Sequence, residues 1–181
     1  MKRVAVFLDR DGVLNRAVVK NGQPHPPASI DEVEILSDAP EALRQLKEAG
    51  FVLIVVSNQP DVARGTTSKA TVEEINVYLA KHMPVDRFIM CYHDSRDGCE
   101  CRKPRPGMLL AGARDFDVDL ASSYMVGDRW RDMEAGINAG CKTIFIDCNY
   151  NEKKPKIFDY KVKSLLSAVN IISKGNGDEK S

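Results

Sequence analysis

Short apolar runs alternate with amphipathic segments along most of the chain. The runs are rich in aliphatic and β-branched side chains, which predicts buried strands at 4–8, 51–56, 87–91, 123–126 and 142–146. Between and after them, apolar residues recur at helical spacing, which predicts helices over about 38–49, 68–82, 106–116, 131–139 and 160–173. This alternation predicts an α/β fold, a Rossmann-like three-layer sandwich with helices on both faces of a central parallel sheet.

One long polar segment interrupts the pattern at 15–34 and contains Pro24-His-Pro-Pro27. Its length favours a flap over a functional site rather than a plain connection. By contrast, the connection between Ser57 and the helix predicted from Ser68 is short, so no large cap domain is expected there. The length of 181 residues fits a single domain over 1–173, and the polar tail at 174–181 is expected to be disordered.

Composition narrows the classes of partner. Lys plus Arg equals Asp plus Glu at 26 each, so no global field attracts nucleic acid or a membrane surface. No apolar stretch approaches the roughly 20 residues that span a bilayer, and no signal peptide follows the first residues. The expectation is a cytoplasmic monomer that acts on a small molecule, with five cysteines present as thiols or metal ligands.

Chemically useful side chains follow four of the predicted strands. Because the carboxyl ends of parallel strands meet at one edge of a sheet, these groups are expected to converge on one crevice. Carboxylates at such a position suit a divalent cation and phosphoryl transfer. The residues concerned are Asp9 and Asp11 after the first strand, Ser57, Asn58 and Gln59 after the second, Arg102 and Lys103 after the third, and Asp128 and Asp132 after the fourth.

A second constellation is the loop that holds Cys91, His93, Cys99 and Cys101. Three thiols and one imidazole on two short arms match the composition of a structural zinc site, with no position left open for catalysis. The predicted zinc-binding loop would rigidify the segment that carries Arg102 and Lys103. Cys141 and Cys148 are expected to be thiols in or near the core.

The motifs Asp9-Arg-Asp11-Gly12, Ser57-Asn58, Arg102-Lys103-Pro104 and Gly127-Asp128-Arg-Trp-Arg-Asp132 resemble those of haloacid dehalogenase-like phosphatases. Within that family the chain is similar to the small phosphatases that act on sugar phosphates and histidinol phosphate. The resemblance covers about residues 3–147.

This resemblance implies a role for each catalytic position. Asp9 would be the nucleophile that forms an aspartyl-phosphate, and Asp11 the general acid and then base. Asp9, the backbone carbonyl of Asp11, and Asp128 would hold Mg²⁺. Ser57 would bind phosphoryl oxygens, and Lys103 would place a fixed positive charge on the transferred group.

Substrate contacts are expected from Asn58, Gln59, Arg64, Arg102 and Arg129. Asn58, Gln59 and Asp132 are equally compatible with roles in turns or helix caps. In a functional role, Asp132 would order either a metal-bound water or Lys103. His25 is compatible with a substrate contact from the flap, but an exposed loop histidine is the preferred interpretation. A surplus of cations on the predicted rim would suit a ligand with a second anionic group. These cations are Arg10, Arg16, Lys20, Arg64, Arg102, Arg105, Arg129 and Arg131.

Of the substrates that the resemblance implies, the rim favours a heptose 1,7-bisphosphate used for surface glycans, because histidinol phosphate carries an amine and an imidazole. Histidinol-phosphate phosphatase is therefore the alternative activity. A polynucleotide 3′-phosphatase fits less well, since the net charge is zero and the zinc loop has no role there. An idle binding or regulatory module remains as an alternative of another class.

Overall fold

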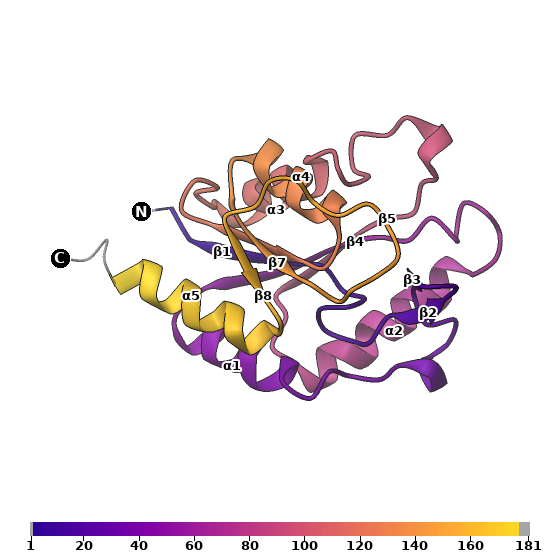
Figure 1. Cartoon of the computed structure of the whole chain (residues 1–181), viewed down its shortest axis with the longest axis horizontal. Helices are drawn as coiled ribbons and strands as arrows, with labels where there is room; N and C mark the ends of the chain where they lie inside the picture. The colour runs from indigo at the N-terminus through magenta and orange to yellow at the C-terminus, as the bar shows by residue number, and fades with distance from the viewer. Residues whose placement is uncertain (1, 178–181) are drawn as a thin grey trace.

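Six parallel strands form the central sheet of the computed structural model, which describes residues 2–177 (Figure 1). In spatial order they are β5 (Arg87–Cys91), β4 (Val52–Asn58), β1 (Ala5–Leu8), β6 (Tyr124–Gly127), β7 (Lys142–Ile146) and β8 (Tyr160–Val162). The chain first adds strands on one side of β1 and then on the other. The carboxyl ends of β1 and β6 therefore flank a topological switch point, where sheets of this kind bind ligands.

Five helices cover the two faces of the sheet (Figure 1). One face is covered by α1 (Ala39–Glu48), α2 (Lys69–His82) and α5 (Leu165–Gly177). The other is covered by α3 (Gly107–Phe116) and α4 (Trp130–Ala139). Three layers result, as the alternation of the sequence predicts, and the site lies at one end of them.

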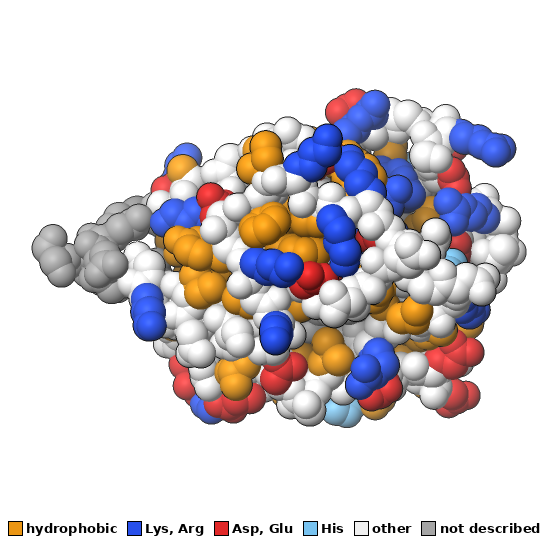
Figure 2. Space-filling view, viewed as in Figure 1, with side chains coloured by type: hydrophobic (Ala, Val, Ile, Leu, Met, Phe, Trp, Pro, Cys, Tyr) orange, Lys and Arg blue, Asp and Glu red, His pale blue; other side chains and the backbone are white. Residues whose placement is uncertain are grey.

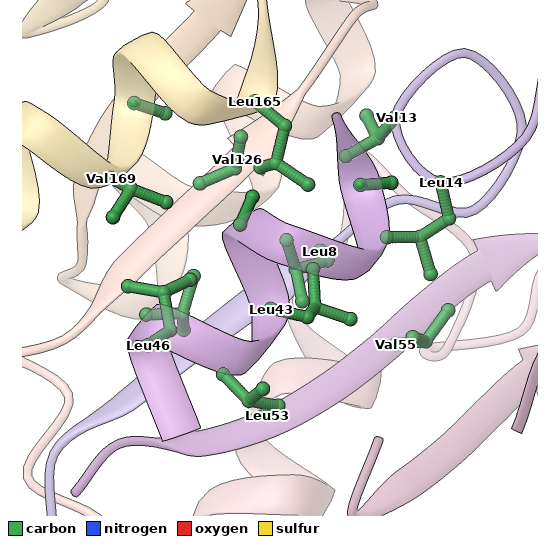
Figure 3. Close-up of a cluster of buried hydrophobic side chains, with 14 of the residues drawn as sticks. Leu8, Val13, Leu14, Leu43, Leu46, Leu53, Val55, Val126, Leu165 and Val169 are labelled. Carbon is green, nitrogen blue, oxygen red and sulfur yellow. The ribbon is translucent and has the colours of Figure 1, made fainter. Parts of the chain in front are cut away.

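Strand β1 is buried on both faces because its side chains alternate between the two layers of helices. Val6 and Leu8 point to the layer of α1 and α5, whereas Ala5 and Phe7 point to that of α3 and α4. Figure 3 shows Leu43 of α1 beside Leu8, with Leu165 and Val169 of α5 packed from above. This packing fixes the strand whose last residue precedes Asp9.

The predicted strands and helices up to residue 146 are confirmed, with ends displaced by one or two residues. The predicted helix over 160–173 is wrong at its start, because β8 occupies 160–162 and α5 begins at Leu165. Tyr160 and Lys161 are exposed, so β8 lacks an apolar signal; it forms because β7 offers a free edge. Asp159 fixes this pairing by accepting hydrogen bonds from the backbone and hydroxyl of Thr143, at 2.7 and 2.8 Å.

Three further segments that were predicted as loops or tail contain regular structure. The segment 15–34 contains a hairpin, β2 (Val18–Lys20) and β3 (Gln23–His25), followed by the 3-10 turn η1 (Ile30–Glu32). A second 3-10 turn, η2 (Ser95–Asp97), lies in the cysteine-rich loop. Residues 174–177 of the predicted tail belong to α5, and 178–181 lie outside the described residues.

None of the helices in the described range combines the length and apolarity that crossing a bilayer requires.

Candidate active site

A cavity of about 240 Å³ opens at the carboxyl edge of the sheet. The flap hairpin closes one side of it, and the loops after β1, β4, β5 and β6 close the others. Its lining includes nine of the eleven site residues predicted for this edge: Asp9, Asp11, Ser57, Asn58, Arg64, Arg102, Lys103, Arg129 and Asp132. The four strand ends therefore converge as expected. Gln59 and Asp128 lie behind the lining.

The centre of the site is a buried ammonium group between two carboxylates. Lys103 Nζ lies 3.0 Å from Asp9 Oδ1 and 2.6 Å from Asp132 Oδ1, and it donates a 2.8 Å hydrogen bond to the Val56 carbonyl. Only 2% of the Lys103 side chain is exposed. Burial alone would lower the pKa of Lys103, but Asp132 and Asp9 outweigh it and raise the pKa. The ammonium is therefore a fixed positive charge beside Asp9.

Three buried carboxylates, those of Asp9, Asp128 and Asp132, have oxygens within 4.8 Å of one another. Burial is the largest cause of the raised pKa of Asp128, and the charges of Asp9 and Asp132 add to it. The pKa of Asp9 is raised mainly by burial and next by the charge of Asp132. Neither oxygen of Asp128 receives a hydrogen bond of normal geometry from the described residues. Crowded, unsatisfied carboxylate oxygens fit a bound divalent cation, because a cation favours their charged forms.

Gly12 is required by the close approach of the loop after β1 to this cluster. Its φ is +91°, and a Cβ atom built there would lie 1.9 Å from Asp128 Oδ2. Any larger residue would both strain the backbone and displace the carboxylate. The glycine that follows Asp11 therefore lets the main chain pass directly against Asp128.

The Asp11 carboxylate accepts hydrogen bonds from three side chains, and the sequence alone did not predict that these three residues meet there. Arg10 donates from Nε at 3.1 Å and from Nη2 at 3.2 Å, and Asn15 and Gln59 each donate from the side-chain amide at 2.9 Å. Arg10 is fully buried and reaches Asn76 of α2 at 3.0 Å. The expectation that Arg10 lies on the exposed rim is wrong, because its guanidinium is committed to Asp11.

Asn58 and Gln59 were expected to contact substrate, and the structure places their amides elsewhere. Asn58 forms two 3.0 Å hydrogen bonds with the backbone of Lys103, one through Oδ1 and one through Nδ2. Gln59 is 1% exposed and lies outside the cavity lining. Its amide donates to Ser57 Oγ at 3.0 Å as well as to Asp11. Asn58 thus fixes the loop of Lys103, and Gln59 links Ser57 to Asp11.

The rim arginines differ in how far they are free to meet a ligand. Arg129 forms a two-pronged salt bridge with Glu152, at 2.9 and 2.5 Å. Arg64 pairs with Asp61 and Asp94. These contacts neutralise two of the arginines that were predicted to bind substrate. Arg129 and Arg64 instead link the loops that form the walls of the site.

Arg102 and Arg131 line the cavity and have no carboxylate partner among the described side chains. Arg102 donates to the His93 carbonyl at 3.0 Å, and Arg131 lies 4.7 Å from the ring centre of Trp130. Burial lowers the pKa of Arg131, and the positive charges of Arg129 and Arg102 lower it further. Figure 2 shows Lys and Arg side chains gathered toward this end of the molecule. An anion between the two free guanidinium groups would relieve their repulsion.

The flap contributes Gln23, Pro24, His25 and Pro26 to the cavity. His25 is half-buried and lines the site, so the interpretation of an exposed histidine is wrong. Nothing in the local sequence distinguished the two outcomes, because the hairpin folds back over the strand ends only through tertiary contacts. One such contact joins Asn151 N to the Gly22 carbonyl at 2.8 Å.

The four predicted zinc ligands come together at the end of β5. Donor atoms of Cys91, His93, Cys99 and Cys101 that contact one another are 3.2 to 3.7 Å apart. These separations are slightly shorter than the roughly 3.8 Å edges of a tetrahedron of thiolates around Zn²⁺, so small shifts would let the four donors bind one ion. Burial raises the pKa of the Cys91 thiol, and the hydrogen bond with the adjacent Cys101 thiol raises it further. A metal ion would offset this cost by binding the thiolates.

Comparisons with known proteins agree with this geometry. A family model described as HAD-hydrolase-like matches residues 100–161. A D-glycero-beta-D-manno-heptose-1,7-bisphosphate 7-phosphatase of Escherichia coli K12 is 39% identical over 155 residues, which cover 77% of this chain and 78% of that protein. The protein of the same name from Pasteurella multocida is 36% identical over 182 residues, covering 93% of this chain and 96% of its own.

A solved structure extends the similarity to the whole fold. The D,D-heptose 1,7-bisphosphate phosphatase of B. bronchiseptica, complexed with magnesium and phosphate, superposes with a TM-score of 0.79 at 32% identity. The match covers 96% of this chain and 99% of the other.

Proposed function

Because the chain belongs to the haloacid dehalogenase-like phosphatases, in the group of the heptose-bisphosphate phosphatases, we propose that it removes the 7-phosphate of D-glycero-β-D-manno-heptose 1,7-bisphosphate. The observation that carries the proposal is the buried Asp9, which contacts the Lys103 ammonium beside an unsatisfied Asp128. The names of the relatives support the β anomer, which the sequence pattern alone left open.

In this proposal Asp9 attacks the phosphorus atom, and the bond from phosphorus to the sugar oxygen breaks. Asp11 protonates the departing sugar oxygen and then takes a proton from the water that hydrolyses the aspartyl-phosphate. Arg10, Asn15 and Gln59 keep the Asp11 carboxyl in one orientation throughout. Lys103 and the Ser57 hydroxyl contact the phosphoryl oxygens as charge develops on them.

Asp9, Asp128 and the backbone carbonyl of Asp11 are the groups we propose to hold Mg²⁺. When bound, Mg²⁺ supplies positive charge that offsets repulsion between the carboxylates and the phosphate. Asp132 has another role in this scheme. Its carboxylate bonds Lys103 on one oxygen and accepts from the Arg129 backbone at 2.9 Å on the other, so it positions the ammonium group.

Arg102 and Arg131 are the groups we propose for the 1-phosphate. Both line the cavity that contains Asp9, and neither is neutralised by a carboxylate within the described part of the chain. Arg129 and Arg64, which were first expected to bind substrate, support the walls through Glu152, Asp61 and Asp94. Two free guanidinium groups on the rim favour a second phosphate over the cationic side chain of histidinol phosphate.

We propose that the cluster of three cysteines and His93 holds a structural Zn²⁺. Four protein ligands complete a tetrahedral site, and Cys101 directly precedes Arg102 and Lys103 in the chain. The metal would therefore fix the start of the segment that delivers both cations. A single domain, a monomeric state and a cytoplasmic location complete the proposal.

The substrate proposal predicts a large preference in kcat/KM. With Mg²⁺ present, the β-heptose 1,7-bisphosphate is expected to exceed both its α anomer and histidinol phosphate by about 100-fold or more, or roughly 2.7 kcal/mol of transition-state binding. Phosphate release from the three compounds at equal concentration measures this. A preference for histidinol phosphate would contradict the role of the rim arginines, and no release from any of them would favour an idle module.

A further inference from the structure

The loop that follows β7 touches the site at three successive residues. Tyr150 lies against Asp128, Asn151 donates its backbone N–H to Gly22 of the flap at 2.8 Å, and Glu152 pairs with Arg129. The loop is itself constrained, because Lys154 and Lys161 both bind Asp147 at its start, at 3.0 and 2.8 Å. A segment far from the catalytic motifs in sequence therefore lies beside them.

The Tyr150 hydroxyl lies beside the Asp128 carboxylate, which receives no standard hydrogen bond from the described residues. Tyr150 is 9% exposed, and its hydroxyl and Asp128 Oδ2 lie against the same point of Gly12. A Cβ built on Gly12 would be 2.7 Å from the hydroxyl and 1.9 Å from Oδ2. The two oxygens are therefore neighbours, although no hydrogen bond of standard geometry joins them.

The chemistry of the phenol suits one role in particular. A tyrosine hydroxyl has an ordinary pKa of about 10, so the Tyr150 phenol carries its proton at neutral pH. A neutral phenol beside a carboxylate can donate a hydrogen bond to it. Unlike the ammonium group of Lys103, a neutral phenol does not repel a cation that binds the same carboxylate.

We propose that Tyr150 is a positioning residue that donates to one oxygen of Asp128 and leaves the other oxygen directed at the Mg²⁺ site. The inference rests on the proposed function, because it assumes that Asp128 is a ligand of the cation. Metal ligands are commonly oriented by such outer hydrogen bonds, and losing one typically weakens metal affinity 10- to 100-fold. Tyr150 would act on metal affinity and not on the reacting atoms.

The test is a Mg²⁺ titration of thermal stability, in the absence of substrate, on the wild-type protein and on Tyr150→Phe. Mg²⁺ is expected to raise the Tm of both, but the variant should need about tenfold more Mg²⁺ for the same half-maximal shift. Its kcat at saturating Mg²⁺ should stay within about twofold of wild type, since phenylalanine preserves the packing. Tyr160→Phe, on the exposed Tyr160 of β8, is the matched control and should titrate as wild type.

The outcomes separate the inference from the function on which it rests. Equal Mg²⁺ requirements for wild type and Tyr150→Phe would overturn the role of Tyr150 and leave the phosphatase proposal standing. A lower kcat at saturating Mg²⁺ with unchanged Mg²⁺ affinity would overturn it too, because the hydroxyl would then act in the chemical step. No Mg²⁺-dependent shift in the wild type would remove both the metal site and the inference.

Discussion

Asp9→Asn is expected to lower kcat for phosphate release by about 10⁴-fold or more while the protein stays folded. An amide nitrogen or oxygen cannot form the acyl-phosphate, so the two-step route is lost rather than slowed. Folding should survive, because the substitution removes one of three crowded carboxylates and keeps the shape of the side chain. The measurement is kcat at saturating Mg²⁺ and substrate, with Tm recorded in the same buffer.

A matched variant on the surface separates a catalytic effect from a general one. Asp115→Asn replaces an exposed carboxylate on α3 and should leave both kcat and Tm unchanged. If Asp9→Asn kept more than about 1% of the wild-type kcat, Asp9 would not be the nucleophile.

Lys103→Met is expected to lower kcat by about 10²- to 10³-fold, which is typical of removing one preorganised group that stabilises transition-state charge. It should also destabilise the fold by about 3–5 kcal/mol, because Asp9 and Asp132 lose the cation buried between them. Both effects come from one side chain that is 2% exposed. Steady-state kinetics and chemical denaturation measure them separately.

A double variant distinguishes the two losses. Adding Asp132→Asn to Lys103→Met removes one of the stranded charges, so stability should recover in part while kcat stays low. Lys81→Met, at an exposed position near the end of α2, is the control for removing a lysine. Recovery of kcat in the double variant would contradict a direct role of Lys103 at the phosphoryl group.

The catalytic core of the site could be predicted from the sequence because local patterns determine it. Each residue proposed for this core lies on a loop that follows a predicted buried strand, as Asp9 follows Ala5–Leu8. The order of strands and helices then places those strand ends at one edge. The zinc cluster was equally local, since its four ligands lie within eleven residues of one another.

The remainder depends on contacts between distant segments, which no periodicity records. Nothing in the sequence around Arg10 predicts that it is buried. Its position depends on hydrogen bonds with Asn76 of α2 and with Asp11. Strand β8 exists because β7 has a free edge, not because its own side chains alternate. Glu152 and Tyr150 were missed for the same reason, because their loop carries no strand-end or motif signal.

The proposed reaction transfers the 7-phosphate of a heptose bisphosphate to water through Asp9. The measurement that tests it most directly is ³¹P spectroscopy of D-glycero-β-D-manno-heptose 1,7-bisphosphate during incubation with the wild-type protein and Mg²⁺. The 7-phosphate resonance is expected to be replaced by that of inorganic phosphate while the anomeric 1-phosphate resonance persists. Loss of the 1-phosphate instead, or no change in either resonance, would contradict it.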